Sequence, residues 1–355
     1  MPNRLPAFAS TRICGVTLIA ILCFPIRLST SAPGADVSFA ASAPAISTSR
    51  FFFATGQNQA PVVAGKPIKM EVALVTVPVI VTGKEGRFVP DLKKTDFRIY
   101  ENGVAQTVDR LVPESDPFHV VLMIDSSGST HFRFGEMQNA ALAFVDSLRP
   151  QDRLLVTYFD SEVHVDADFT EDRTRLRQAL RPIPGEGGQT RLYDALEIVM
   201  RERLGRIQGR KAIVLFTDGV DNESLRTGPA ETLAMIEQSD VIVYTIQYDT
   251  RKDGTPDRFQ VPTPAGYAGF NTMYSRAIKY LSNLAGHSGG RLYHAETLPG
   301  LQSAFAQIAE ELSRQYTLCY YPANQKRDGS FRRIRVNVAQ PGVESRARAG
   351  YRAGR

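Results

Sequence analysis

From residue 118 onward, hydrophobic positions along the chain alternate between two patterns. Four short apolar runs, at 120–124, 154–159, 213–216 and 241–246, are typical of strands covered on both faces. Other apolar residues recur at the three- and four-residue spacing of amphipathic helices. These helical stripes lie over 137–148, 176–183, 192–199 and 301–312. Strands that alternate with amphipathic helices predict an α/β domain with a doubly wound, mostly parallel sheet.

The regions on either side of this alternation have the patterns of β-strands. Before it, residues 72–81 form a run rich in valine, and Asn102-Gly103 between two strand-like segments predicts a tight hairpin. After it, residues 334–338 alternate apolar and polar side chains, as in a strand with one buried face. The sequence therefore predicts a small β-rich flanking module beside the α/β domain.

The first 43 residues have the order of an export signal. Two arginines precede an apolar run over 13–24, and small residues follow it, with candidate cleavage contexts at 30–32 and 41–43. A run of about a dozen residues is too short to span roughly 30 Å of hydrocarbon comfortably. We predict a cleaved signal peptide and an exported protein, which is periplasmic, envelope-associated or secreted. A retained N-terminal membrane anchor is the alternative.

These patterns divide the chain into five parts. We predict a signal peptide (1–43), a linker (44–66), a β-rich module (67–115), an α/β domain (116–315) and C-terminal strands that pack with the β-rich module (316–355). Within the α/β part, 249–275 is interrupted by Gly and Pro. We expect a functional surface loop or a disordered segment there.

Charge and cysteine content narrow the function classes. The formal net charge of +5 is mild for 355 residues and gives no indication of nucleic-acid binding. Cys319 is the one cysteine outside the predicted signal, so an internal disulfide is excluded, and its apolar neighbours predict a buried strand cysteine. The tail from 326 holds nine Lys and Arg against two acidic residues. We interpret it as the polar face of an edge strand, with attachment to acidic envelope or membrane surfaces as the alternative.

Three polar segments lie where predicted strands end or a predicted helix begins, so the topology could gather them at one edge of the sheet. The segment 125–129, Asp-Ser-Ser-Gly-Ser, comes directly after the most apolar strand, Asp218 comes after the strand 213–216, and Thr190 opens a helix. In open α/β sheets, ligands lie beyond the carboxyl ends of the strands. Hydroxyl and carboxylate oxygens favour Mg²⁺, with Mn²⁺ or Ca²⁺ possible, and the lack of Cys and His disfavours zinc. Neutral hydroxyl ligands would leave such a cation able to bind a carboxylate from a partner.

At these residues the chain resembles the von Willebrand factor type A family. That family's metal-ion-dependent adhesion site has the pattern Asp-x-Ser-x-Ser, a separate Thr and a separate Asp, matched here by Asp125, Ser127, Ser129, Thr190 and Asp218. The resemblance covers roughly 117–315 and implies a Rossmann-like fold. It also implies that the three hydroxyls bind the metal, while the two carboxylates act directly or through water. The flanking regions look like those of exported bacterial proteins known as VWFA-related domain proteins.

The resemblance implies a recognition module of the adhesion type, which binds a carboxylate of a protein partner through the metal and is not an enzyme. An Mg²⁺-dependent hydrolase of the cell envelope is one alternative, with Asp125 or Ser127 as nucleophile. The sequence lacks the Gly-x-Ser-x-Gly elbow and the phosphate-binding loop of common hydrolases. A structural envelope protein with a vestigial site is the other alternative.

Neighbouring polar residues have simpler interpretations. Asp-Ser-Ser-Gly-Ser by itself is also typical of a turn followed by a helix N-cap. We expect Asp194 to compensate a helix dipole, Asp221 and Glu223 to lie in a solvated loop, and His131 to be a surface or structural residue.

Overall fold

The structure is a computed structural model that describes residues 74–112, 115–128, 134–181, 189–248 and 264–354. The chain divides into two units, Met1–Lys66 and Pro67–Arg355, and all described residues belong to the second. The predicted signal peptide and linker, Ser129 and His131 lie outside the described residues. Within the described ranges, no helix combines the length and apolar character needed to cross a membrane.

A six-stranded sheet forms the centre of the α/β domain, in the order β10-β9-β8-β5-β6-β7. All neighbouring strands are parallel except β6 and β7, which pair antiparallel. The strands are β5 (Phe118–Asp125), β6 (Arg153–Phe159), β7 (Val163–Thr170), β8 (Arg210–Thr217), β9 (Ile242–Gln247) and β10 (Leu292–His294). The prediction of a mostly parallel α/β sheet is confirmed.

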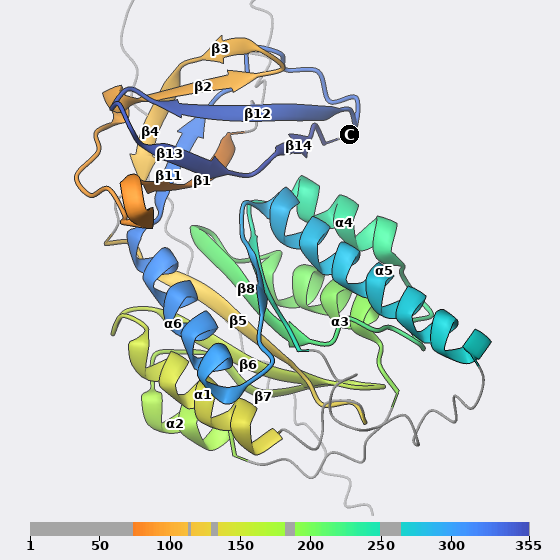
Figure 1. The fold of residues 1–355 in the computed structure, drawn as a ribbon. Helices are drawn as coiled ribbons and strands as arrows, with labels where there is room; N and C mark the ends of the chain where they lie inside the picture. The colour runs from red at the N-terminus through yellow and green to blue at the C-terminus, as the bar shows by residue number, and fades with distance from the viewer. Residues whose placement is uncertain (1–73, 113–114, 129–133, 182–188, 249–263, 355) are drawn as a thin grey trace, which may run out of the picture. The chain divides into compact units, whose positions relative to one another are not determined.

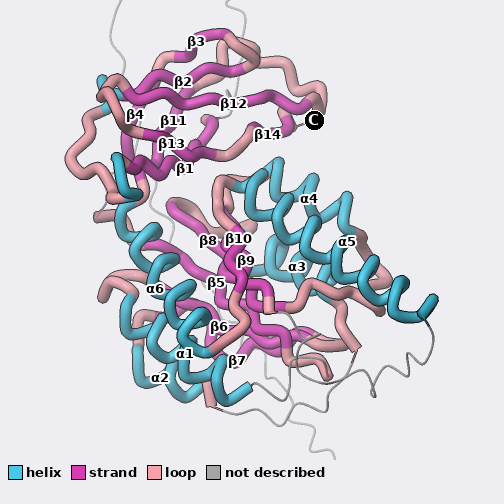
Figure 2. Tube along the Cα trace, in the orientation of Figure 1, coloured by secondary structure: helices cyan, strands magenta, loops and turns pink. Residues whose placement is uncertain are grey.

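Helices cover both faces of this sheet (Figures 1 and 2). Apolar side chains of α1, α2 and α6 pack on one face, and those of α3, η4, α4 and α5 pack on the other. The helices are α1 (Phe134–Ser147), α2 (Arg173–Ala179), α3 (Leu192–Ile198), the π-helical η4 (Val199–Leu204), α4 (Pro229–Gln238), α5 (Pro264–Ser288) and α6 (Leu298–Arg314). The fold is therefore doubly wound, as the alternating pattern predicts.

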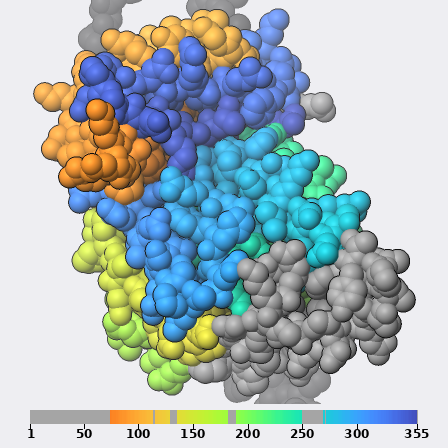
Figure 3. All heavy atoms as spheres, in the orientation of Figure 1, coloured from red at the N-terminus to blue at the C-terminus, as the bar shows by residue number. Residues whose placement is uncertain are grey.

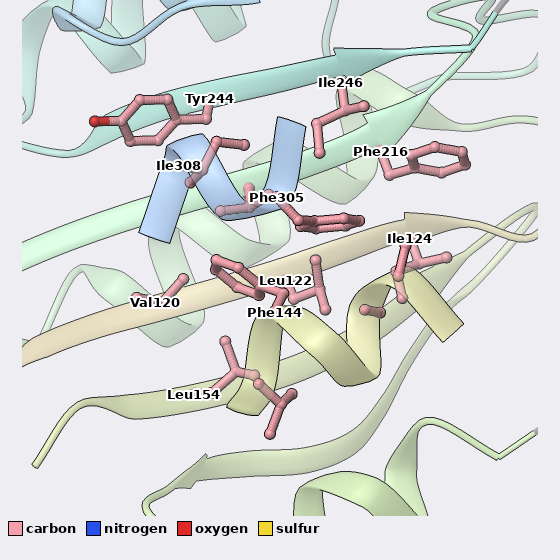
Figure 4. Packing of buried hydrophobic residues seen from close by; sticks show 14 of the residues in the cluster. Val120, Leu122, Ile124, Phe144, Leu154, Phe216, Tyr244, Ile246, Phe305 and Ile308 are labelled. Atoms are coloured by element: carbon pink, nitrogen blue, oxygen red, sulfur yellow. The ribbon is translucent and has the colours of Figure 1, made fainter. Parts of the chain in front are cut away.

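The central strand β5 shows how the sequence selects the two faces. Val120, Leu122 and Ile124 point into the layer under α1 and α6, where they meet Phe144 and Phe305 (Figure 4). The intervening residues of β5 point to the opposite helix layer. A strand covered on both faces needs apolar side chains at every position, which explains the continuous run. On the face shown in Figure 3, the side chains of α6 lie against those of α1.

The flanking strands form two four-stranded sheets, β13-β1-β11-β4 and β14-β12-β2-β3, around a separate core. The first sheet contains β1 (Val75–Thr82), β4 (Val108–Val112), β11 (Tyr316–Tyr320) and β13 (Glu344–Ala347). The second contains β2 (Phe97–Glu101), β3 (Val104–Gln106), β12 (Phe331–Val338) and β14 (Gly350–Arg352). Two 3-10 turns, η1 (Lys84–Gly86) and η2 (Lys94–Asp96), connect the early strands. Strands from both ends of the second unit thus pair with each other.

The β-rich module contains the predicted hairpin, the strand cysteine and the basic tail. Asn102 and Gly103 have φ values of 49° and 85° and join β2 to β3, as a tight hairpin turn requires. Cys319 is buried in β11, which confirms the strand cysteine. The interpretation of the basic tail as an edge strand is wrong for β12, which is an inner strand and buries Arg332.

The stretch 249–275 is only partly a loop. Its first part, 249–263, lies outside the described residues, whereas residues from 264 onward form the start of α5. The expectation of a loop up to 275 is therefore wrong. Pro264 is the first residue of the helix, and proline is favoured in the first helical turn, where its missing N–H costs no hydrogen bond.

Candidate metal site

Asp125 ends β5, and its carboxylate is held from two sides. The side chain is fully buried at 0% exposure, and Ser127 is buried beside it. The backbone N–H of Ser127 donates to Oδ1 of Asp125 at 3.0 Å. The Thr217 hydroxyl, from the end of β8, donates to Oδ2 at 2.6 Å. These bonds fix the carboxylate at the carboxyl edge of the sheet.

Asp218 follows β8 directly and is also 0% exposed. Its Oδ1 accepts the backbone N–H of Val220 at 2.9 Å, and its Oδ2 accepts the Tyr274 hydroxyl of α5 at 3.3 Å. Strands β5 and β8 are neighbours and run parallel (Figure 2), so Asp125 and Asp218 at their carboxyl ends lie at the same edge of the sheet.

Gly219 allows the Asp218 loop to pack tightly on α5. Its φ of 82° lies in the left-handed region, which glycine adopts without a steric penalty. A Cβ at this position would approach Leu281 Cδ1 to 2.8 Å and Ala277 Cβ to 3.2 Å. The Thr-Asp-Gly sequence thus satisfies a backbone requirement as well as providing a carboxylate.

Thr190 lies just before α3 and is joined to the loop that follows Asp218. Its backbone N–H donates to Oδ1 of Asn222 at 2.8 Å, and its carbonyl accepts from the Asn222 N–H at 3.1 Å. Asn222 is four residues beyond Asp218 in the sequence. Thr190 itself is buried.

Backbone carbonyls at the end of β6 connect the Asp125 loop to the segment that contains Thr190. The Phe159 carbonyl accepts the N–H of Ser126 at 2.9 Å, and the next carbonyl, of Asp160, accepts the N–H of Arg191 at 2.9 Å. Ser126 lies between Asp125 and Ser127, and Arg191 follows Thr190. The structure therefore brings Asp125, Ser127, Thr190 and Asp218 to one edge of the sheet, whereas Ser129 lies outside the described residues.

The two carboxylates influence each other electrostatically. Burial and, after it, the charge of Asp218 raise the pKa of Asp125 to about 7, although hydrogen bonds from Ser127 and Thr217 act in the lowering direction. Two buried like charges at interacting distance are unfavourable, and a cation between them would relieve the repulsion.

The donor set suits a hard divalent cation. Asp125 and Asp218 provide carboxylate oxygens, and Ser127 and Thr190 provide hydroxyl oxygens, which are the donors that Mg²⁺ and Mn²⁺ prefer. In the described ranges, no three or more His, Cys, Asp and Glu side chains form a metal-binding group. A site with two carboxylates and several hydroxyls would not form such a group, so this finding is consistent with the expected composition.

Three residues that support this edge were not singled out from the sequence: Thr217, Asn222 and Tyr274. Thr217 and Asn222 flank Asp218 in Thr-Asp-Gly-Val-Asp-Asn, so their position beside a strand end was a usable signal. Tyr274 had no such signal, because it lies in the part of α5 that was expected to be a loop.

The acidic residues near the edge mainly organise its loops. Asp194 lies in the first turn of α3, as expected for dipole compensation, but its carboxylate also accepts backbone N–H groups from three successive residues, 225–227. Asp221 accepts the Tyr193 N–H, and Glu223 pairs with Arg191 at 3.1 Å. Asp221 and Glu223 thus lie in a loop whose residues are half-buried or exposed, as expected for a solvated loop, and hydrogen bonds order that loop.

Comparisons with known proteins place this edge in a family context. Residues 120–220 match the family model described as von Willebrand factor type A domain. No curated protein matches the chain. The match includes the Asp125 loop, Thr190 and Asp218.

Several solved structures are similar to parts of the chain. A von Willebrand factor type A protein from Catenulispora acidiphila is 10% identical, with 79% of this chain and 72% of that chain covered and a TM-score of 0.45. BatB from Bacteroides thetaiotaomicron is 17% identical, with 55% and 98% covered and a TM-score of 0.42.

Proximal thread matrix protein 1 from the mussel byssus, described with a zinc-occupied MIDAS motif, is 17% identical, with 61% of this chain covered and a TM-score of 0.44. This chain spans 50% of the length of that protein. The chain thus carries a domain of the von Willebrand factor type A family, and residues 120–220 are the segment that matches it.

Proposed function

We propose that this protein is a metal-dependent recognition module of the adhesion type, which binds an acidic group of a protein partner through a divalent cation. Asp125, Ser127, Ser129, Thr190 and Asp218 would hold the cation, with Mg²⁺ preferred and Mn²⁺ or Ca²⁺ possible. The proposal also places the module outside the cytoplasm, as the N-terminal sequence predicts.

The observation that carries the proposal is the pairing of two fully buried carboxylates at adjacent strand ends. Asp125 and Asp218 are each 0% exposed and close enough for the charge of one to raise the pKa of the other. Such an arrangement lowers the stability of the metal-free fold, and a bound cation would turn this repulsion into attraction. Buried groups that conflict in this way are typical of functional sites.

The chemistry of the cation favours recognition over turnover. Hydroxyl ligands are neutral, so the metal keeps much of its positive charge and attracts an external carboxylate strongly. The carboxylate oxygens of Asp125 already accept hydrogen bonds from Ser127 and Thr217, which orients them and makes them less available for nucleophilic attack. The binding of an acidic side chain would use this charge without any bond being broken.

Metal titration of neighbouring serine variants tests the proposal. The full chain should bind Mn²⁺ and Mg²⁺ saturably in isothermal titration calorimetry, and Ser127→Ala should weaken binding by about tenfold or more. Ser126→Ala is the matched control, since the Ser126 hydroxyl is also buried but donates to the Phe159 carbonyl. It should leave the affinity within about threefold. Equal losses in the two variants, or no saturable binding, would refute the metal site.

Recognition is tested separately from metal storage. The immobilised full chain should retain protein from an envelope extract in Mg²⁺, release it on chelation, and fail to retain it as Ser127→Ala. An Mg²⁺-dependent turnover of phosphate or acyl esters that is lost in Asp125→Ala would instead support the hydrolase.

A further inference from the structure

A cavity lies away from the candidate metal site, at the amino ends of the sheet strands. Its volume is about 630 Å³, within the range of roughly 300–1,000 Å³ found for small-molecule sites. The end of α4 and the residues before β9 form one wall, and β1, β14 and the loop after β11 form the others. The candidate metal site lies instead at the carboxyl ends of β5 and β8.

Positive charge dominates the lining of this cavity. Five basic side chains contribute, against a single acidic one, Asp240: Lys326, Arg327, Arg332, Arg348 and Arg352. The acidic residue pairs with Lys211 from outside the cavity at 2.8 Å. Lys211 therefore compensates part of the negative charge of Asp240.

Carboxylates behind the wall compensate two of the five basic residues. Arg332 pairs with the buried Glu101 at 3.2 Å, and Arg352 pairs with the buried Glu237. Neither Arg348 nor Lys326 forms an ion pair with a carboxylate in the described ranges. Arg348 and Lys326 are thus the basic residues of this lining that could pair directly with an incoming anion.

Arg348 is the unusual member of the set. It is 4% exposed, and its guanidinium donates to three backbone carbonyls, those of Gly350, Ser239 and Glu237, at 2.6–2.8 Å. A guanidinium has five N–H donors, so these three bonds fix its orientation and leave donor capacity for a ligand. Burial lowers the pKa of Arg348 to about 10, which still keeps it charged at neutral pH. The carboxylates of Asp240 and Glu237 favour its positive charge without forming an ion pair with it, so its guanidinium can still pair directly with an anionic ligand.

We propose that this cavity binds a phosphate monoester, with Arg348 at its wall and Lys326 at its exposed rim as the charged contacts. A phosphate group carries about −1.5 to −2 at neutral pH, which suits two basic side chains that form no ion pair in the described ranges. The planar fork of an arginine suits phosphate oxygens better than a point charge does. Apolar atoms of Val75, Pro322 and Tyr351 also line the cavity and would contact the organic part of the ester.

The probe for the first experiment is phenyl phosphate, because it combines a dianion with a small apolar group. Titration into the full chain in chelator, followed by calorimetry, should show saturable binding that weakens with added salt. Lys326→Glu should lower the affinity by about tenfold or more, because it removes one charge-assisted contact and adds a repulsive charge. Lys326 is exposed, so this variant should keep the thermal stability of the parent.

The matched control is Lys279→Glu, which makes the same charge change at an exposed position of α5 outside the cavity lining. It should leave the affinity unchanged within about twofold. Arg348→Lys is a second variant. Because Arg348 is buried, the unfolding of this variant is measured first to show that it folds. Weaker phenyl phosphate binding by the folded variant supports the arginine contact. Equal losses for the two glutamate variants, or no saturable binding of phenyl phosphate, overturn the proposal.

Vesicles distinguish a soluble ester from a lipid headgroup as the source of the phosphate. If a lipid headgroup enters the cavity, the parent should sediment with vesicles that contain phosphatidic acid. Lys326→Glu should then reduce this binding, whereas Lys279→Glu should not. Binding of phenyl phosphate without vesicle binding supports a soluble ester. Vesicle binding that falls equally in both variants indicates general electrostatic attraction to the membrane surface. If phenyl phosphate also fails to bind, the proposed phosphate site is contradicted.

Discussion

The two ends of the central sheet handle buried charge in opposite ways. At the carboxyl ends, Asp125 and Asp218 bring two like charges together, and the pKa of Asp125 rises to about 7. At the amino ends, arginines from the C-terminal strands are oriented by carboxylates and backbone carbonyls, as Arg332 is by Glu101. The charge of Arg332 is thus compensated within the fold, whereas the charges of Asp125 and Asp218 are not compensated by each other.

This difference teaches where stability and function lie in the molecule. Removal of one member of a compensated pair leaves the other charge buried and should be strongly destabilising. Removal of one member of a repulsive pair should relieve the metal-free fold. Opposite responses to the loss of a charge therefore distinguish a structural charge from a functional one.

The largest effect is expected at the compensated end. Arg332→Ala should destabilise the protein by about 3–5 kcal/mol, because it leaves the Glu101 carboxylate buried without its cation. Chemical denaturation measures this change. Arg333→Ala, at the adjacent exposed position of β12, should cost no more than about 0.5 kcal/mol. Similar losses for the two variants would show that Arg332 is not a structural ion-pair member.

A smaller and opposite effect is expected from pH at the carboxylate end. The folded-state pKa of Asp125, about 7, lies above its usual value of 3.8, so the folded state holds this proton more tightly than the unfolded state does. In chelator, protonated Asp125 therefore contributes fully to stability below about pH 4, and this contribution is lost as the pH rises through 7. Its upper limit is about 4 kcal/mol.

Chemical denaturation between pH 5 and 8 measures this effect in the parent and in Asp125→Asn. The other titrating groups are the same in both proteins, so their contributions cancel in the comparison. Asp125→Asn should remove much of the decline toward pH 8, and added Mg²⁺ should offset it in the parent alone. A parent and variant with the same pH profile would contradict a raised pKa at Asp125.

The sequence predicted the carboxylate end better than the arginine end, for a physical reason. Asp125 directly follows a continuous apolar run, and Asp218 follows another after Thr217. Neighbouring parallel strands place their carboxyl ends together whatever the rest of the chain does. Arg332 gave no comparable signal, because its burial depends on Glu101, which lies 231 residues earlier in the chain. Arginines in an alternating strand are usually solvated, so the local pattern indicated exposure.

Helix α5 shows the same limit within the α/β domain. Its first residues follow a stretch with several Gly and Pro residues, which locally favours loops. Its helical state depends instead on long-range packing of residues such as Leu281 and Leu284 beneath the sheet. The Tyr274 contact with Asp218 follows from that packing and could not be predicted from spacing alone.

Gly219 provides the smallest expected effect and separates backbone strain from packing at the carboxylate end. Gly219→Ala should destabilise by about 2–3 kcal/mol, because alanine must adopt a left-handed φ and its Cβ would lie 2.8 Å from Leu281. Gly103→Ala is the control, since its φ is also positive but its Cβ would meet no atom within 4 Å. It should cost about 1 kcal/mol, from strain alone.

Metal affinity gives the second readout for these two glycines. A shift of the Asp218 loop away from α5 should weaken Mn²⁺ binding in Gly219→Ala, whereas Gly103→Ala should leave it unchanged, because the β2–β3 hairpin is remote from the sheet edge. If Gly219→Ala lost stability but kept full Mn²⁺ affinity, the loop would tolerate displacement. The placement of Asp218 would then owe less to its packing on α5 than to the strand that precedes it.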